Sequence, residues 1–222
     1  MGPWTSPDED GFGKAPFFCL GAGFPYGIIV DPNTGKRFVN ELGNRYERSM
    51  AILKEVGHPV VCLTDADGAQ HSLEKDLAKC EPAVKSYESI PALAQAYGMD
   101  SNVLQQTVQD YNDGVKNGKD SFGKPLREDL KPIVTPPFYA TRLWPKVHHC
   151  MGGLQIDEDA RVIHIDSHPI GGLFAAGEIV GGVHGGDRLG SCATLDCLSF
   201  GRIAGHSAAL REPVKHIIDL VA

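Results

Sequence analysis

Residues 172–190 of this 222-residue chain read GLFAAGEIVGGVHGGDRLG. The apolar run from Gly172 to Ala176 predicts a buried strand, and a helix rich in small residues is predicted behind the loop, from Ala193 to Leu210. A strand, a glycine-rich loop and a helix in this order let backbone N–H groups point at an anionic or carbonyl-rich ligand, aided by the positive end of the helix. We therefore predict that this stretch binds a ligand through its backbone. The alternative is a plain strand–turn–helix connection whose glycines only make tight turns.

The overall composition is that of a globular protein, with 42% hydrophobic and 22% charged residues. The 21 Lys and Arg residues against 28 Asp and Glu give a formal net charge of −7, so we expect no nucleic-acid partner. No apolar run approaches the roughly 18–20 residues of a membrane span. The first residues show neither the basic segment nor the apolar core of a signal peptide, which predicts a cytoplasmic protein.

The cysteines are scattered, and none forms a Cys-x-x-Cys pair that would indicate a zinc knuckle or a dithiol redox motif. We therefore expect no metal site. Most of the cysteines are expected to be small buried side chains in a reducing compartment, and disulfides are an alternative that their spacing does not support. The six are Cys19, Cys62, Cys80, Cys150, Cys192 and Cys197.

Short strands and helices are predicted before a proline-rich joint at residues 132–137. The pattern predicts a hairpin of residues 27–31 and 36–40, and a further strand at residues 59–63. Helices are predicted at residues 44–55, 90–97 and 103–115, the last capped by Asp100 or Ser101. After the joint, residues 154–157 and 161–166 are expected to pair as a hairpin.

Three segments together resemble the C-terminal flavin-binding signature of fumarate-reductase-type flavoproteins, in particular the soluble FAD-dependent fumarate and urocanate reductases. They are residues 148–153 (HHCMGG), residues 172–178 and the loop that ends at Gly190. Residues 35–45 (GKRFVNELGNR) resemble the mobile clamp, or capping, domain of the same family. The resemblance extends over about residues 27–210.

This resemblance implies FAD as the cofactor and an unsaturated carboxylate as the substrate, reduced at its carbon–carbon double bond by hydride transfer from flavin N5. Arg45 matches the family's proton donor, and His148 and Arg188 match the pair that binds the substrate carboxylate. The positions that match FAD contacts are His149, Gly177, Glu178, Ser191, Ala193, Thr194 and Leu195.

The chain also departs from the family pattern. Family members carry Gly-Gly-Asn after the Arg-Leu pair, whereas this chain has Gly190, Ser191 and Cys192. Where dicarboxylate-specific members hold the second carboxylate, this chain has Pro and Phe residues followed by Cys19, Leu20 and Gly21. We therefore expect a monocarboxylate with a different or aromatic tail rather than fumarate. Phe24 and Tyr26 are candidates to line the tail site, with simple packing as the alternative.

The expected architecture is an α+β clamp (capping) domain at residues 1–132, followed by the C-terminal segment of an α/β FAD-binding domain at residues 133–222. The N-terminal Rossmann βαβ unit is expected to be missing, because Gly21–Gly27 has the wrong glycine spacing for a dinucleotide loop and a proline where a helix should start. An N-terminal FAD-binding portion, from the same gene or a separate chain, is then the expected partner.

Two other interpretations of the same residues stay open. The chain could be a truncated, catalytically silent fragment or a binding module of such a flavoprotein. It could also be a ketosteroid dehydrogenase-like flavoenzyme, although that mechanism needs a Tyr acid where this chain has Arg45.

Overall fold

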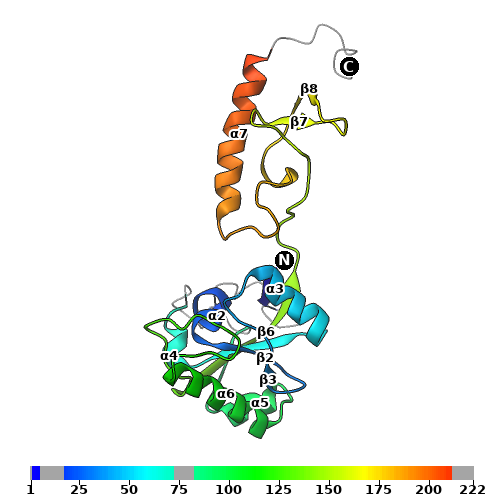
Figure 1. Ribbon diagram of the computed structural model, residues 1–222. Coiled ribbons are helices and arrows are strands. Elements are labelled where there is room, and N and C mark those ends of the chain that lie inside the picture. The colour runs from blue at the N-terminus through cyan, green and yellow to red at the C-terminus, as the bar shows by residue number, and fades with distance from the viewer. Residues whose placement is uncertain (1, 6–17, 73–82, 212–222) are drawn as a thin grey trace. The chain divides into compact units, whose positions relative to one another are not determined.

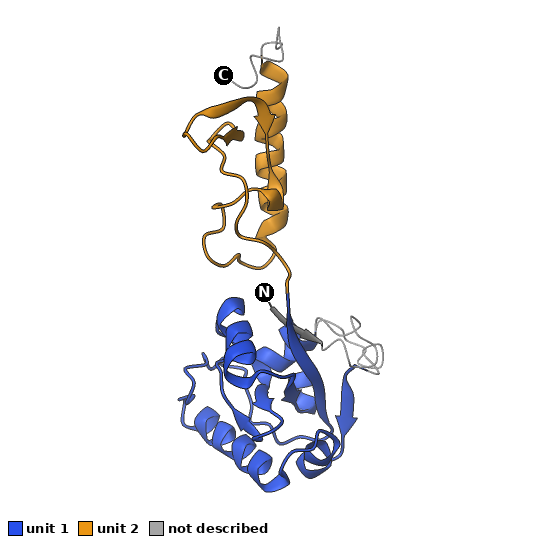
Figure 2. Ribbon diagram, turned by 90° about the vertical axis from the view of Figure 1, so that its right-hand side faces the viewer, with its two compact units in different colours: residues 1–146 blue, residues 147–222 orange. Residues whose placement is uncertain are grey.

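The computed structural model describes residues 2–5, 18–72 and 83–211. It divides into two compact units, Met1–Lys146 and Val147–Ala222, which are coloured separately in Figure 2. The division falls later than the expected boundary at residues 132/133. The reason is strand β6 (Phe138–Lys146), which belongs to the sheet of the first unit and carries the chain past the proline-rich joint.

The first unit is built on one six-stranded sheet in which the paired strands are antiparallel. The strand order is β1-β6-β4-β2-β3, and β5 also pairs with β6. Besides β6, the strands are β1 (Gly2–Thr5), β2 (Ile28–Asp31), β3 (Lys36–Arg37), β4 (Val60–Thr64) and β5 (Lys85–Tyr87). The predicted hairpin of residues 27–31 and 36–40 is confirmed by the pairing of β2 with β3, and the predicted strand at 59–63 is confirmed by β4.

Helices cover both faces of this sheet (Figure 1). On one face lie α5 and α6, and on the other lie α2 and α3. The helical segments of the unit are η1 (a π-helical turn, Cys19–Gly23), α2 (Phe24–Tyr26), α3 (Arg45–Met50), η2 (π-helical, Ala51–Val56), α4 (Ala66–Ala69), α5 (Ile90–Ala96) and α6 (Ser101–Lys116).

Strand β2 is buried on both sides because its alternate residues enter two different cores. Ile28 and Val30 pack in one cluster with Leu93 and Leu104 of helices α5 and α6. Ile29 points the other way and belongs to a second cluster that includes Phe18, Phe24 and Ile52. The central strands therefore read as continuous apolar runs although the sheet is antiparallel.

The three predicted helices of this unit are confirmed. The helix expected at residues 44–55 forms as α3 followed without a break by η2, and it ends at Gly57, whose φ of +78° is the left-handed conformation that favours glycine. The side chain of Asp100 accepts hydrogen bonds from the backbone N–H groups of Asn102 and Val103, which confirms it as the cap of α6.

The second unit consists of the hairpin β7 (Arg161–Ile163) and β8 (Pro169–Phe174), a 3₁₀ turn η4 (Gly177–Ile179) and helix α7 (Cys192–Leu210). The predicted pairing of residues 154–157 with 161–166 is confirmed over its inner part: an antiparallel bridge joins Ile156 to Val162, the backbone N–H of Asp157 donates to Arg161, and that of Ile163 donates to Gln155. The pairing of β7 with β8 was not predicted. The segment 172–176 is also less buried than predicted, since Leu173 is 44% exposed. The small core of this unit, centred on Val162, Ala175 and Val180, includes only Ala175 of that segment.

Helix α7 confirms the helix predicted from Ala193 to Leu210. Among its residues only Asp196 is buried, while Leu195, Leu198 and Leu210 are exposed. The side of α7 that carries these leucines is thus an apolar surface in the unit as described. Within the described residues, no helix combines the length and the apolarity that a membrane crossing needs.

The five cysteines within the described residues are free thiols. Cys19 and Cys62 are buried, as predicted for small apolar side chains, and burial raises the pKa of the Cys62 thiol. The same prediction was wrong for Cys150 and Cys197, which are exposed. Cys80 lies outside the described residues.

Candidate functional site

The structure brings together two of the three predicted catalytic residues. Nη2 of Arg188 lies 3.1 Å from Nε2 of His148, although the two residues are separated by forty positions in the sequence. Arg188 is only 6% exposed, and its Nη1 donates to the carbonyl oxygen of Leu189. Within the described residues its Nε has no hydrogen-bond partner and no carboxylate forms an ion pair with it. A buried guanidinium in this state is suited to bind an anion.

The predicted flavin-contact residues His149 and Glu178 also meet. Nδ1 of His149 lies 3.5 Å from Oε2 of Glu178, and Oε1 of the same carboxylate accepts a hydrogen bond of 3.0 Å from the backbone N–H of Cys150. Glu178 thus ties the HHCMGG segment to η4. His149 is 8% exposed, and its buried Nε2 has no partner among the described residues. A ligand atom can therefore satisfy that nitrogen.

A second imidazole–carboxylate pair was not predicted from the sequence. Nε2 of His184 lies 3.1 Å from Oδ2 of Asp196, and the ring of His184 packs edge-on against that of His149 with centroids 5.4 Å apart. Asp196 is 5% exposed, and its Oδ1 is buried without a hydrogen-bond partner. The available signal was Asp196 itself, a charged residue in an otherwise small and apolar stretch of helix.

The other predicted contact positions lie where the chain changes direction. Gly177 opens η4 with a φ of +77°, the conformation for which glycine is best suited. Ser191, Ala193, Thr194 and Leu195 lie at the start of α7. Ser191 has a φ of +66°, which a residue other than glycine adopts only at a cost. No side chain caps this helix end and its first turn carries no acidic residue, so the end is open to an anionic or carbonyl group.

The third predicted catalytic residue, Arg45, lies in the first unit, as the first residue of α3. The helix is capped by the side chain of Asn44, which accepts a 2.8 Å hydrogen bond from the backbone N–H of Glu47. A cation in the first turn opposes the helix dipole and costs about 0.3–1 kcal/mol. Helix stability therefore does not explain an arginine at this position, which favours a functional reason.

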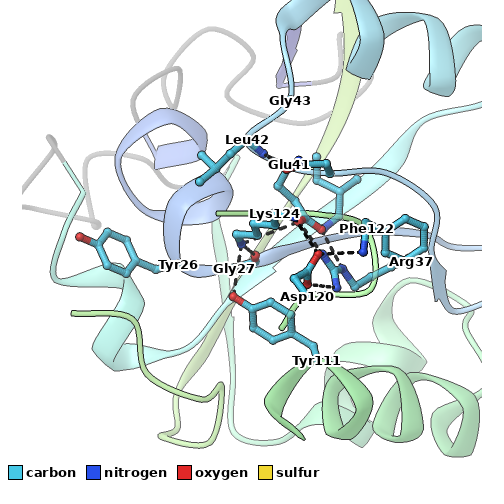
Figure 3. Close-up of polar contacts among 12 residues, drawn as sticks. Tyr26, Gly27, Arg37, Glu41, Leu42, Gly43, Tyr111, Asp120, Phe122 and Lys124 are labelled. Carbon is cyan, nitrogen blue, oxygen red and sulfur yellow. Dashed lines mark hydrogen bonds and ion pairs between the residues drawn. The ribbon is translucent and has the colours of Figure 1, made fainter. Parts of the chain in front are cut away.

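The loop before Arg45 is held by a buried network of charges, shown in Figure 3. Arg37 donates to both carboxylate oxygens of Glu41, at 3.0 and 2.8 Å, and to Asp120 at 2.7 Å. Its guanidinium also lies 5.0 Å from the ring centroids of Tyr111 and Phe122. Glu41 is completely buried and accepts the backbone N–H of Ile29 in β2. The network fixes the loop against the sheet and helix α6.

The buried ammonium group of Lys124 is the second cation of this network (Figure 3). Its Nζ donates to the carbonyl oxygen of Gly27 at 2.5 Å and lies 3.7 Å from Oε2 of Glu41. Burial lowers the pKa of Lys124 to about 8, against the partial compensation of the Glu41 carboxylate. Burial raises the pKa of Tyr111, whose hydroxyl lies 3.2 Å from the same ammonium. These residues act as structural anchors inside the first unit.

Phe24 and Tyr26 are both packed inside the first unit. Phe24 is 3% exposed, belongs to the second core cluster and lies under the guanidinium of Arg48. Tyr26 stacks on the ring of His71 and donates a 2.6 Å hydrogen bond to Asp129. The cavity beside Tyr26 measures only about 50 Å³. The packing alternative thus accounts for their positions.

Comparisons with known proteins match most of the chain to one family. Residues 14–194 match the FAD binding domain family. The chain is 40% identical over 211 residues to the acrylate reductase flavoprotein subunit of Shewanella woodyi, a match that covers 91% of this chain and 41% of that protein. The chain therefore spans less than half the length of this relative.

Two solved structures are similar as well. The open conformation of a flavocytochrome c3 fumarate reductase superposes with a TM-score of 0.65 at 38% identity, covering 83% of this chain and 32% of that one. The 3-ketosteroid Δ1-dehydrogenase from Sterolibacterium denitrificans gives a TM-score of 0.68 at 26% identity, covering 95% of this chain and 44% of that one.

FAD is the cofactor that these matches indicate, and the second unit fits the flavin end of it. The fit rests on the unpartnered buried Nε2 of His149 and on the uncapped start of α7. Within the described residues no parallel strand–helix–strand unit carries a Gly-x-Gly-x-x-Gly loop for the ADP end.

Proposed function

Since this chain belongs to the FAD binding domain family, we propose that it carries the substrate-reducing part of an FAD-dependent oxidoreductase that acts on an unsaturated carboxylate. The observation that carries the proposal is Arg188, a buried guanidinium beside His148 with no carboxylate paired to it among the described residues. FAD, when bound, supplies the hydride for the carbon–carbon double bond. The protein supplies binding, orientation and the proton.

Arg188 and His148 are proposed to bind the substrate carboxylate. The planar guanidinium can contact both carboxylate oxygens at once, which fixes the orientation of the molecule in a way that a lysine cannot. His148 lies beside it as a second polar group that can polarise the carboxylate and draw electron density from the conjugated double bond. The carbon that accepts the hydride is thereby made more electrophilic.

Arg45 is proposed to deliver the proton to the other alkene carbon. It lies at the start of α3, behind a loop that Arg37, Glu41 and Asp120 hold rigidly. Its side chain is partly exposed, so a spent proton can be replaced from water. A positioned proton donor accelerates such steps by about 10²–10⁴-fold.

A monocarboxylate is the proposed substrate class. The relative at 40% identity is named for acrylate, a monocarboxylate, and the positions of the second-carboxylate site hold Cys19, Leu20 and Gly21. The ketosteroid dehydrogenase alternative is less favoured, because this chain has Arg45 where that chemistry needs a tyrosine acid. The clamp and partial FAD-domain roles, expected for residues 1–132 and 133–222, remain part of the proposal, with β6 assigned to the clamp because it belongs to the sheet of the first unit.

The proposed partner is the portion that binds the ADP half of FAD, from the same gene or a separate chain. The longer relatives support this partner, and so do the exposed Leu195, Leu198 and Leu210 of α7. An apolar helix face of this kind in a globular protein usually lies against another part of a domain or a partner.

The proposal is tested by the variants Arg45→Ala and Arg188→Ala in the FAD-loaded protein. Turnover is measured anaerobically as acrylate-dependent oxidation of reduced methyl viologen, and FAD retention is measured by absorption after gel filtration. Both variants are expected to lose turnover, by about 10²-fold or more for Arg45→Ala, while FAD is retained. Lys54→Ala, an exposed change in the continuation of the same helix, is the matched control.

Normal turnover in both arginine variants would contradict the proposal. A wild-type protein that retains no FAD even beside the N-terminal portion of a relative would instead favour the silent-fragment alternative.

A further inference from the structure

The turn of the β7–β8 hairpin brings three metal-ligating side chains together, away from the residues discussed above. His164, Asp166 and His168 each offer one ligand atom, and these atoms lie within 4.8 Å of one another. Nδ1 of His164 is 3.1 Å from Oδ2 of Asp166. The two imidazole rings stack with centroids 4.9 Å apart at an interplanar angle of 28°.

The backbone of the turn fixes this arrangement. Ile163 and Pro169 are opposite each other in the β7–β8 register, so the two strands are held together directly before and after the turn. The backbone N–H of His164 donates to the carbonyl oxygen of His168 at 2.8 Å, and that of Ser167 donates to the carbonyl oxygen of His164 at 2.9 Å. The two histidines therefore stay opposite each other, with Asp166 between them at the tip.

The donor set selects the class of ion. Two imidazole nitrogens and one carboxylate oxygen suit Zn²⁺ and the neighbouring divalent transition metals, whereas Ca²⁺ and Mg²⁺ prefer sites made of oxygen ligands. All three side chains are exposed, so they can rotate to shorten the spacing of their ligand atoms around an ion. Three protein ligands leave a position open for water or for another ligand.

We infer that this turn, residues 164–168, is a surface site for a divalent transition-metal ion of the Zn²⁺ class, bound by His164, Asp166 and His168. The signal in the sequence was a His-x-Asp-x-His spacing. Such a spacing brings the three side chains together only where the chain reverses, and the hairpin that reverses here differs from the predicted one. The expectation of no metal site rested on the spacing of the cysteines alone.

The test is a Zn²⁺ titration of the full-length, untagged chain in competition with a chromophoric chelator. The variants are the double change His164→Ala/His168→Ala and the single change Asp166→Asn. His206→Ala, which removes an exposed histidine of α7, is the matched control. Because all these side chains are exposed, the far-ultraviolet circular dichroism spectrum is expected to be the same for every variant.

One tightly bound Zn²⁺ per chain is expected in the wild type and in the His206→Ala variant. The double histidine variant should weaken binding by about tenfold or more, and Asp166→Asn by a smaller factor. An unchanged affinity in the double variant would overturn the inference. So would a Co²⁺-loaded wild type with thiolate charge-transfer bands that Cys150→Ser abolishes, because the ion would then be bound elsewhere.

Discussion

Arg188 is the residue on which the functional account depends most. It is 6% exposed and contacts His148 and the carbonyl oxygen of Leu189, but no carboxylate among the described residues. Proteins rarely bury a cation without an anionic partner, because desolvation of the charge is costly. A substrate carboxylate would supply the missing partner.

The change Arg188→Lys tests whether the shape of the guanidinium matters as well as its charge. Loss of a bidentate, charge-assisted contact worth about 1.5–3 kcal/mol should raise the KM for acrylate by about tenfold or more. Steady-state kinetics of the FAD-loaded protein measure this, with Arg202→Lys on the exposed side of α7 as the control. An unchanged KM would argue against carboxylate binding by Arg188.

Asp120 is the residue through which pH should act on the stability of the first unit. Burial raises the pKa of this carboxyl, but hydrogen bonds from Arg37 and from the backbone N–H groups of Lys124 and Phe122 outweigh that effect and lower it below the ordinary value. The paired carboxylate therefore stabilises the fold above the unfolded pKa of about 3.9, and this contribution is lost as the pH falls through the lowered folded pKa.

Asp120→Asn should lower the free energy of unfolding by about 1–3 kcal/mol near neutral pH, since Arg37 loses a buried anionic partner. The difference between wild type and variant should shrink as the pH falls below about 4, where the carboxyl of the unfolded chain becomes protonated, and should be lost once the pH passes the lowered pKa of the folded protein. Urea unfolding followed by circular dichroism over this pH range measures it. A difference that stays constant with pH would show that the charge of Asp120 contributes nothing.

At the scale of elements, Gly152 and Gly153 form a natural pair of test positions in the HHCMGG segment. A Cβ at Gly153 would overlap the carbonyl oxygen of Ile179, in the place where the backbone N–H of Leu154 donates to that oxygen at 2.8 Å. A Cβ at Gly152 would meet no atom within 4 Å. The close approach therefore concerns only the second glycine.

Gly153→Ala is expected to force the HHCMGG segment away from η4 and to destabilise the second unit by about 1–3 kcal/mol. Gly152→Ala should change the stability by no more than about 0.5 kcal/mol. Hydrogen exchange of the backbone amides at residues 154–181, followed by mass spectrometry, measures this local stability. Equal protection in the two variants would contradict the close packing of Gly153.

The elements that the sequence predicted correctly are those with strong local signals. The hairpin around residues 32–35 has turn residues, and α6 has both a cap at Asp100 and an apolar stripe. The pairing of β7 with residues 154–157 was predicted from their turn, whereas its pairing with β8 on the other side was not, because residues 164–166 were expected to continue the strand and not to turn. β1 was missed because its pairing with β6 joins segments at opposite ends of the unit.

In the candidate site, too, some contacts were expected from the sequence and others were not. The contact between His148 and Arg188 was expected from the resemblance of their motifs to a known family, and the structure brings them to 3.1 Å. The pair of His184 and Asp196 was not expected, because nothing in the spacing of a glycine-rich loop and a helix marks which side chains will be buried together. Which side chains are buried together depends on how the whole unit folds, and the local sequence pattern around each residue does not predict it.

At the scale of the whole molecule, the chain contributes two units with different tasks in the proposed reaction. The first unit carries Arg45 at the start of α3, directly after a loop that buried charges anchor, and the second carries Arg188, His148 and the candidate flavin contacts. The chain spans 41% of the length of its acrylate reductase relative. The proposed activity accordingly belongs to these units acting with an ADP-binding portion.

The most direct test of the central claim is the absorption spectrum of the chain assembled with the N-terminal, ADP-binding portion of a relative and loaded with FAD, reduced chemically under anaerobic conditions and then mixed with acrylate. The account predicts that the bands of oxidised flavin return with acrylate and do not return with propionate, its saturated counterpart. A spectrum that stays reduced with acrylate, fumarate and urocanate alike would contradict the claim that this protein reduces unsaturated carboxylates.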